Sequence, residues 1–184
     1  TDIPIAKATY KTTAGSKRYA EEWFMKERIP KDVRVIAITT QGDYYHSQAT
    51  RNAGSDIILS IINKLLDDDK NLHIILYGNS MDLEVESPRV HFLTEDLEDG
   101  VSLDEQAAIV EQCDAAVGYD SGAVDMAFAL GLPGFRLGEY HPDFDECFTN
   151  DFIIGLRLWM ETPENVSVLI DELMEYLNYR ANGG

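Results

Sequence analysis

The chain has 184 residues, of which 45% are hydrophobic and 26% are charged, as expected for a globular domain large enough to bury its own core. Its net charge of −18 comes from 33 acidic and 15 basic residues, and no basic stripe offsets it. Such a field repels polyanions, so nucleic acid and anionic membranes are not expected partners of this acidic protein.

The first half of the chain predicts two strands and two helices from the spacing of its apolar residues. A helical face of isoleucine and leucine residues lies between the two strands, with Ser55 or Asp56 as its N-cap. In chain order these elements are a linker-like segment over 1–14, a helix over 15–28, a strand over 33–40, a helix over 54–70 and a strand over 72–78.

The second half continues the alternation of strands and helices. Ser102 and Glu105 form a capping-box pattern, Gly131 lies at a helix C-cap position, and Pro163 begins the last helix. The predicted elements are a strand over 89–93, a helix over 102–113, a strand over 115–119, a helix over 121–131, a strand over 134–137 and a helix over 163–180.

Strands that alternate with helices indicate a parallel sheet covered on both faces. We therefore expect residues 1–184 to form one Rossmann-like domain, an α/β doubly wound parallel sheet of about five strands with helices on both faces. No run of about 18 apolar residues is present, so no membrane span is predicted. The N-terminal residues lack the pattern of a secretory signal.

A turn of small residues follows the strand over 115–119 and opens the next helix. In such sheets, ligands bind at the carboxyl ends of the strands, where helix N-termini favour phosphate. The turn is also typical of tight strand-to-helix packing, and taken alone it supports either interpretation. Its residues are Asp120, Ser121, Gly122 and Ala123.

Polar turns also follow two other predicted strands. Hydroxyls, a glycine and an arginine after the strand over 33–40 could hold phosphate oxygens, although Arg51 is equally typical of a solvated helix residue. After the strand over 72–78, a carboxylate such as Glu84 could accept from ribose hydroxyls. The candidate residues are Thr39, Thr40, Gln41, Gly42 and Arg51 in the first turn, and Gly78, Asn79, Asp82 and Glu84 in the second.

Residues 101–137 resemble the C-terminal part of the family 9 glycosyltransferases, the lipopolysaccharide heptosyltransferases. The resemblance covers roughly residues 15 to 140, and its most specific part is the stretch from Asp120 to Pro133. It implies the nucleotide-diphosphate-sugar-binding half of a two-domain GT-B fold. In that case Asp120 to Ala123 would face the donor diphosphate and sugar, Thr39, Thr40 and Arg51 would contact phosphate, and Glu84 would lie near the ribose.

The sequence departs from the family in two ways. Asp125 stands where the family has a histidine, and an ionised carboxylate repels phosphate unless a cation such as Mg²⁺ intervenes. Otherwise no cofactor is required. The family also has an N-terminal domain that binds the acceptor and usually supplies the catalytic base. The chain has no room for it, so a separate N-terminal domain or a homo-oligomer is an expected partner.

Two alternatives remain at this point. UDP-N-acetylglucosamine 2-epimerases have a similar DSGG turn followed by acidic residues, and an arginine after the next strand, where Asp125 and Arg136 lie here. The chain could also be a non-catalytic binding or assembly module. That role predicts exposed apolar residues on a partner-facing surface: Phe152, Ile153, Leu158 and Trp159. No catalytic base, sugar or acceptor is identified by the sequence.

The remaining reactive residues predict no further site. Cys113 and Cys147 have neither metal-ligand nor disulfide spacing, so a reducing, cytoplasmic setting is expected and Cys113 is expected to be buried. Of the 4 histidines, His73 and His91 are predicted to be satisfied core groups. The acidic segment 141–146 could bind a hard cation, but it is more typical of a solvated loop, and no metal site is predicted.

Overall fold

The computed structural model describes residues 8–39, 48–77, 83, 85–93, 101–119, 121–137, 153–156 and 162–183. Six parallel strands form one sheet in the order β3-β2-β1-β4-β5-β6. The strands are β1 (Arg34–Thr39), β2 (Leu72–Tyr77), β3 (Val90–Leu93), β4 (Ala115–Tyr119), β5 (Gly134–Leu137) and β6 (Ile153–Leu156). The predicted doubly wound α/β class is confirmed.

Strand β6 extends the sheet beyond the runs that the sequence marked as strands. It pairs with β5, with Ile153 opposite Gly134. The sequence marks no strand here, because a four-residue run that contains a glycine is a weak strand signal. The exposure of Ile153, which the non-catalytic alternative predicts, lies outside what the structure describes. Pairing with the preformed edge of β5 is a tertiary contribution that local spacing does not reveal. The other residues of that predicted surface lie outside the described part of the chain.

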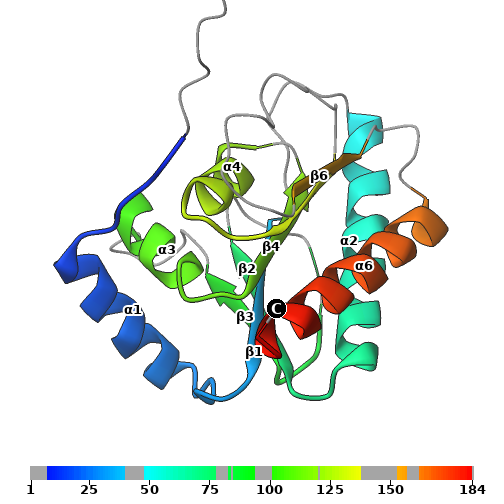
Figure 1. Cartoon of the computed structure of the whole chain (residues 1–184). Helices are drawn as coiled ribbons and strands as arrows, with labels where there is room; N and C mark the ends of the chain where they lie inside the picture. The colour runs from blue at the N-terminus through cyan, green and yellow to red at the C-terminus, as the bar shows by residue number, and fades with distance from the viewer. Residues whose placement is uncertain are drawn as a thin grey trace, which may run out of the picture.

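Helices cover both faces of the sheet (Figure 1). Three helices, α1 (Ala14–Lys26), α3 (Leu103–Val110) and α4 (Gly122–Ala129), pack on one face, and two, α2 (Gln48–Asp68) and α6 (Pro163–Ala181), pack on the other. Alternate strand residues serve the two apolar clusters: Ile36 and Ile38 face α2 and α6, whereas Ala37 faces the other side. Because both faces are buried, the strands have continuous apolar runs instead of alternating ones.

Helix caps confirm two of the predicted boundaries. The Ser102 side chain accepts from the Glu105 backbone N–H while the Glu105 carboxylate accepts from the Ser102 backbone N–H, which is the predicted capping box. Gly131 follows the C-cap of α4 with a φ of 97°. The N–H groups of Gly131 and Leu132 donate to carbonyls of the last turn of α4, so the chain turns sharply into β5.

The predicted start of the second helix is wrong. Helix α2 begins at Gln48, so Ser55 and Asp56 lie inside it instead of capping it. Ala49, Arg51 and Ala53 are good helix formers, and they extend the helix toward the carboxyl end of β1. Gly54 is accommodated inside this helix of 21 residues.

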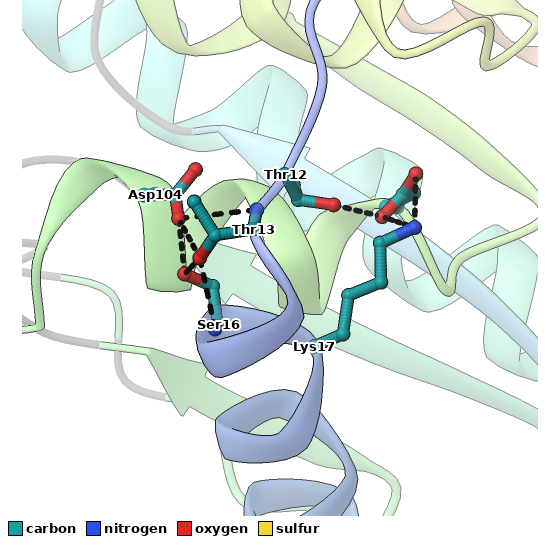
Figure 2. Close-up of polar contacts among 6 residues, drawn as sticks. Thr12, Thr13, Ser16, Lys17 and Asp104 are labelled. Atoms are coloured by element: carbon teal, nitrogen blue, oxygen red, sulfur yellow. Dashed lines mark hydrogen bonds and ion pairs between the residues drawn. The ribbon is translucent and has the colours of Figure 1, made fainter.

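Polar contacts hold α1 against α3 (Figure 2). Asp104 accepts from the backbone N–H and hydroxyl of Thr13 and from the hydroxyl of Ser16, and these donors lower the pKa of Asp104. Glu111 accepts from Thr12 and Lys17. The backbone of Tyr10 also donates to the carbonyl of Ala129, at 2.9 Å. The end of the linker-like segment therefore packs on α3 and α4.

His73 and His91 satisfy one another, as predicted for core histidines. His73 Nδ1 lies 2.9 Å from His91 Nε2, and His91 Nδ1 lies 3.4 Å from Glu27 Oε2. The two rings stack with a centroid separation of 5.3 Å. Burial lowers the pKa of His73 below its usual 6.5, and the nearby His91 and Arg89 add to the shift. The folded protein therefore resists protonation of His73.

Acidification is expected to destabilise the protein through His73. Because the pKa of this group is lower in the folded than in the unfolded chain, the unfolded state binds more protons below pH 6.5, and the free energy of unfolding falls as the pH is lowered. Urea unfolding at about pH 7.5 and about pH 5.5 measures this slope. The His73→Gln variant should show a shallower slope than the wild type, and equal slopes would rule out His73 as the cause.

Candidate functional site

The strand order places a topological switch point between β1 and β4. Chain connections leave these two strands toward opposite edges of the sheet, and ligands in open α/β sheets bind outside the carboxyl ends at such a point. Here the last residue of β1, Thr39, lies opposite Gly118 of β4. One row of register partners crosses this edge of the sheet: Tyr77, Thr39, Gly118, Arg136 and Gly155.

The first turn of α4 is tied to this row from both sides. The hydroxyl of Tyr77 donates to the carbonyl of Ala123 at 2.9 Å. Arg136 Nη1 lies 3.3 Å from Asp125 Oδ1. Burial raises the pKa of Tyr77 well above its usual 10.0, so the phenol stays neutral and acts as a donor. The helix N-terminus is thus held over the ends of β1 and β4.

Thr39 lies in the middle of the row. Its side chain is 1% exposed, and its hydroxyl finds no hydrogen-bond partner among the described residues. A Cβ added at Gly118 would lie 2.2 Å from Thr39 Oγ1, so only glycine leaves room for this hydroxyl. Buried hydroxyls almost always have a partner, and an exception requires an explanation such as a ligand or a bound water.

The N-terminus of α4 adds donors of its own. Ser121 is the N-cap, and its side chain accepts from the backbone N–H of Val124. Helix geometry leaves the N–H groups of Gly122 and Ala123 without acceptors inside the helix, and the helix dipole places partial positive charge there. A Cβ at Gly122 would meet no described atom within 4 Å, so the backbone is open to close approach. These features suit a phosphate group.

The structure brings together part of the predicted site. Thr39, Ser121, Gly122, Ala123 and Asp125 lie at the ends of β1 and β4 and in the first turn of α4. Arg51 lies in the first turn of α2, and its side chain is outside the described part. The other predicted residues also lie outside it: Thr40, Gln41, Gly42, Gly78, Asn79, Asp82, Glu84 and Asp120.

Sequence reasoning missed two features of the site. Tyr77 ends a run that predicts only a strand, although a tyrosine at the end of an apolar run offers a polar group at the sheet edge. The pairing of Asp125 with Arg136 was also missed. An arginine inside the apolar strand β5 was the available signal, because a buried guanidinium requires an acidic partner.

The described residues contain neither a metal-binding cluster nor a membrane-spanning helix. No three acidic, histidine or cysteine side chains there are grouped so that they could hold a metal ion. Within those ranges, none of the helices combines the length and the apolar character needed to cross a bilayer. Cys113 is a buried free thiol, as predicted, and burial raises its pKa.

No family model and no curated protein sequence matches the chain, but several solved structures do. E. coli ADP-heptose lipopolysaccharide heptosyltransferase II matches with a TM-score of 0.69 and 20% identity over 98% of this chain and 56% of that one. A family 9 glycosyl transferase from Veillonella parvula matches with a TM-score of 0.64 and 15% identity over 95% and 54% of the two chains. A putative UDP-N-acetylglucosamine 2-epimerase from Listeria monocytogenes matches with a TM-score of 0.54 and 14% identity, over 82% of this chain and 38% of that one.

These comparisons confirm the expected resemblance at the level of fold. The chain has the Rossmann-like architecture of one half of the GT-B glycosyltransferases, and it spans little more than half the length of the first two structures. The identities are 20% or lower, so the similarity concerns architecture and transfers no residue role.

Proposed function

We propose that this chain is the donor-binding half of a GT-B glycosyltransferase and that it binds a nucleotide-diphosphate sugar. The observation that carries the proposal is the buried Thr39 hydroxyl, which lacks a protein partner among the described residues and lies at the switch point beneath the N-terminus of α4. The fold of the similar structures is compatible with this role.

In this proposal the diphosphate lies against the first turn of α4. The amides of Gly122 and Ala123 donate to its oxygens, and Thr39 donates to it directly or through a bound water. These donors stabilise the charge that develops on the departing nucleoside diphosphate. Asp120 and Ser121 also face the donor in this proposal. Thr40 and Arg51 contact phosphate, and Glu84 lies near the ribose. Gln41, Gly42 and Gly78 complete the proposed nucleotide-binding set.

Sugar transfer also needs an acceptor site and a base. We propose that an N-terminal domain or a second copy of this chain supplies them, because this chain spans little more than half the length of the first two similar structures. Mg²⁺ would assist diphosphate binding if repulsion from the acidic side chains near the turn exceeds the attraction of its hydrogen-bond donors. A reducing, cytoplasmic setting is proposed as well, and it fits the buried free thiol of Cys113.

Calorimetric titration with ADP, UDP and GDP, with and without Mg²⁺, tests the proposal. One nucleotide is expected to bind saturably, and Gly122→Val is expected to weaken that binding at least about tenfold because its side chain blocks the helix amides. Gly15→Val, the same exchange in the first turn of α1, is the matched control and should leave the affinity unchanged.

The alternatives predict other results. Absence of binding by all three nucleotides would contradict the donor-binding role and favour the non-catalytic module. If Gly122→Val binds the nucleotide as tightly as the wild type, the binding site does not lie at the N-terminus of α4. Turnover of UDP-N-acetylglucosamine without an acceptor would favour the epimerase-like alternative. The Listeria structure, a putative epimerase, is similar to this chain in fold.

A further inference from the structure

The ion pair between Asp125 and Arg136 lies at the edge of the proposed phosphate site. Arg136 is 1% exposed, whereas the side chain of Asp125 is 25% exposed. Asp125 belongs to the first turn of α4, and Arg136 lies opposite Gly118 in the row of register partners that also contains Thr39. A buried cation and a half-buried anion thus meet next to the helix amides.

The charge of Asp125 would otherwise oppose the function of the turn. An ionised carboxylate in the first helical turn lies within a few ångströms of an anion bound to the helix amides, where like charges repel strongly. Contact with a guanidinium cancels most of this field at the distance of the ligand. A buried guanidinium likewise needs a carboxylate, because an unpaired buried charge is costly. Each residue therefore removes the penalty of the other.

We propose that Arg136 is a positioning residue that neutralises Asp125 and holds it against the sheet, so that the N-terminus of α4 can accept a nucleoside diphosphate. This inference rests on the proposed function. Arg136 touches Asp125 and acts on the ligand through it. This role differs from that of a residue that only anchors α4 on β5. An anchor requires contact and shape, whereas neutralisation requires a positive charge at position 136 as long as position 125 is negative.

Nucleotide affinities of charge variants separate the two roles. Arg136→Met removes the guanidinium that contacts Asp125, and the affinity for the best-binding nucleoside diphosphate should fall about tenfold. Adding Asp125→Asn to this variant removes the negative charge at position 125, and the affinity should return to within about threefold of the wild type. Arg136→Lys keeps the cation and should retain most of the affinity. Lys64→Met breaks the remote Lys64–Asp171 ion pair and is the control, expected to bind normally.

Two results would overturn the inference. If Arg136→Met and the double variant lose affinity equally, the pair is only an anchor. If Arg136→Met binds like the wild type, Asp125 has no effect on the ligand. Should Arg136→Met fail to fold, the double variant and Arg136→Lys still decide, because the inference requires both to bind.

Failure of the proposed function is recognised separately. If the wild type binds no nucleoside diphosphate, the proposed function is wrong. Urea unfolding of the same variants then measures whether Asp125 and Arg136 stabilise one another, independently of any ligand. A double-mutant cycle with a coupling of about threefold or more in the unfolding constant would support mutual neutralisation. Additive effects of Asp125→Asn and Arg136→Met would refute it.

Discussion

Replacing Gly134 by alanine is expected to lower the free energy of unfolding by about 4 kcal/mol, a loss typical of a severe clash at a strained backbone position. Gly134 begins β5 opposite Ala116 of β4 and has a φ of 159°. An added Cβ would lie 1.7 Å from the carbonyl oxygen of Ala116. Because that oxygen belongs to the backbone of a central strand, β4 and β5 must separate to admit the methyl group.

Urea unfolding of Gly134→Ala, followed by circular dichroism, measures this loss. Gly15→Ala in the first turn of α1 is the matched control, since the added Cβ would meet only Thr13 Oγ1 at 3.9 Å. It should leave the protein as stable as the wild type or stabilise it by a few tenths of a kcal/mol, about the helix propensity gained. Equal stabilities of the two variants would contradict the close approach of β4 and β5.

Replacing Gly118 by alanine is expected to cost about 2 kcal/mol of unfolding free energy, a typical penalty for overpacking a buried position. The added Cβ would lie 2.2 Å from Thr39 Oγ1 and 3.1 Å from Thr39 Cγ2. Thr39 is β-branched and buried, so its side chain has little freedom to move away. Gly118→Ala should therefore also displace the hydroxyl that the proposed ligand needs.

A second exchange tests this cause. Thr39→Ala removes Oγ1 and Cγ2 and leaves only Thr39 Cβ, at 3.0 Å from the added Cβ. The Gly118→Ala/Thr39→Ala double variant should therefore regain at least about half of the stability that Gly118→Ala loses. Unfolding of the four proteins in urea completes the cycle. A double variant less stable than either single variant would show that Gly118 is required by contacts other than those with Thr39.

Local sequence patterns determined most of the secondary structure. The run over 33–40 predicts β1 because uninterrupted apolar residues mark a strand that is buried on both faces. Ser102 with Glu105, and Gly131 at its positive φ, set helix ends through contacts within one or two turns. Such interactions join residues that are close in sequence, so they can be predicted without knowledge of the rest of the fold.

The edges of elements were harder to predict where tertiary contacts decide them. Strand β6 exists as a strand because β5 offers it a hydrogen-bonding edge, and its own four residues carry little strand signal. The start of α2 at Gln48, instead of near Ser55, places further helical turns close to the carboxyl end of β1. In β6 the weak local preference is overridden by pairing with β5, whereas the early start of α2 follows the helix propensity of the residues before Gly54.

The sequence by itself determined the fold class and pointed to the turn after β4 as a phosphate-facing element. Only the tertiary structure decided which side chains surround that turn. Tyr77, Thr39, Gly118 and Arg136 come from four strands and meet in one row because of the order and register of the parallel sheet. Register is set by packing of whole strands and helices, so no local spacing could reveal that Thr39 is buried without a partner among the described residues or that Asp125 is paired with Arg136.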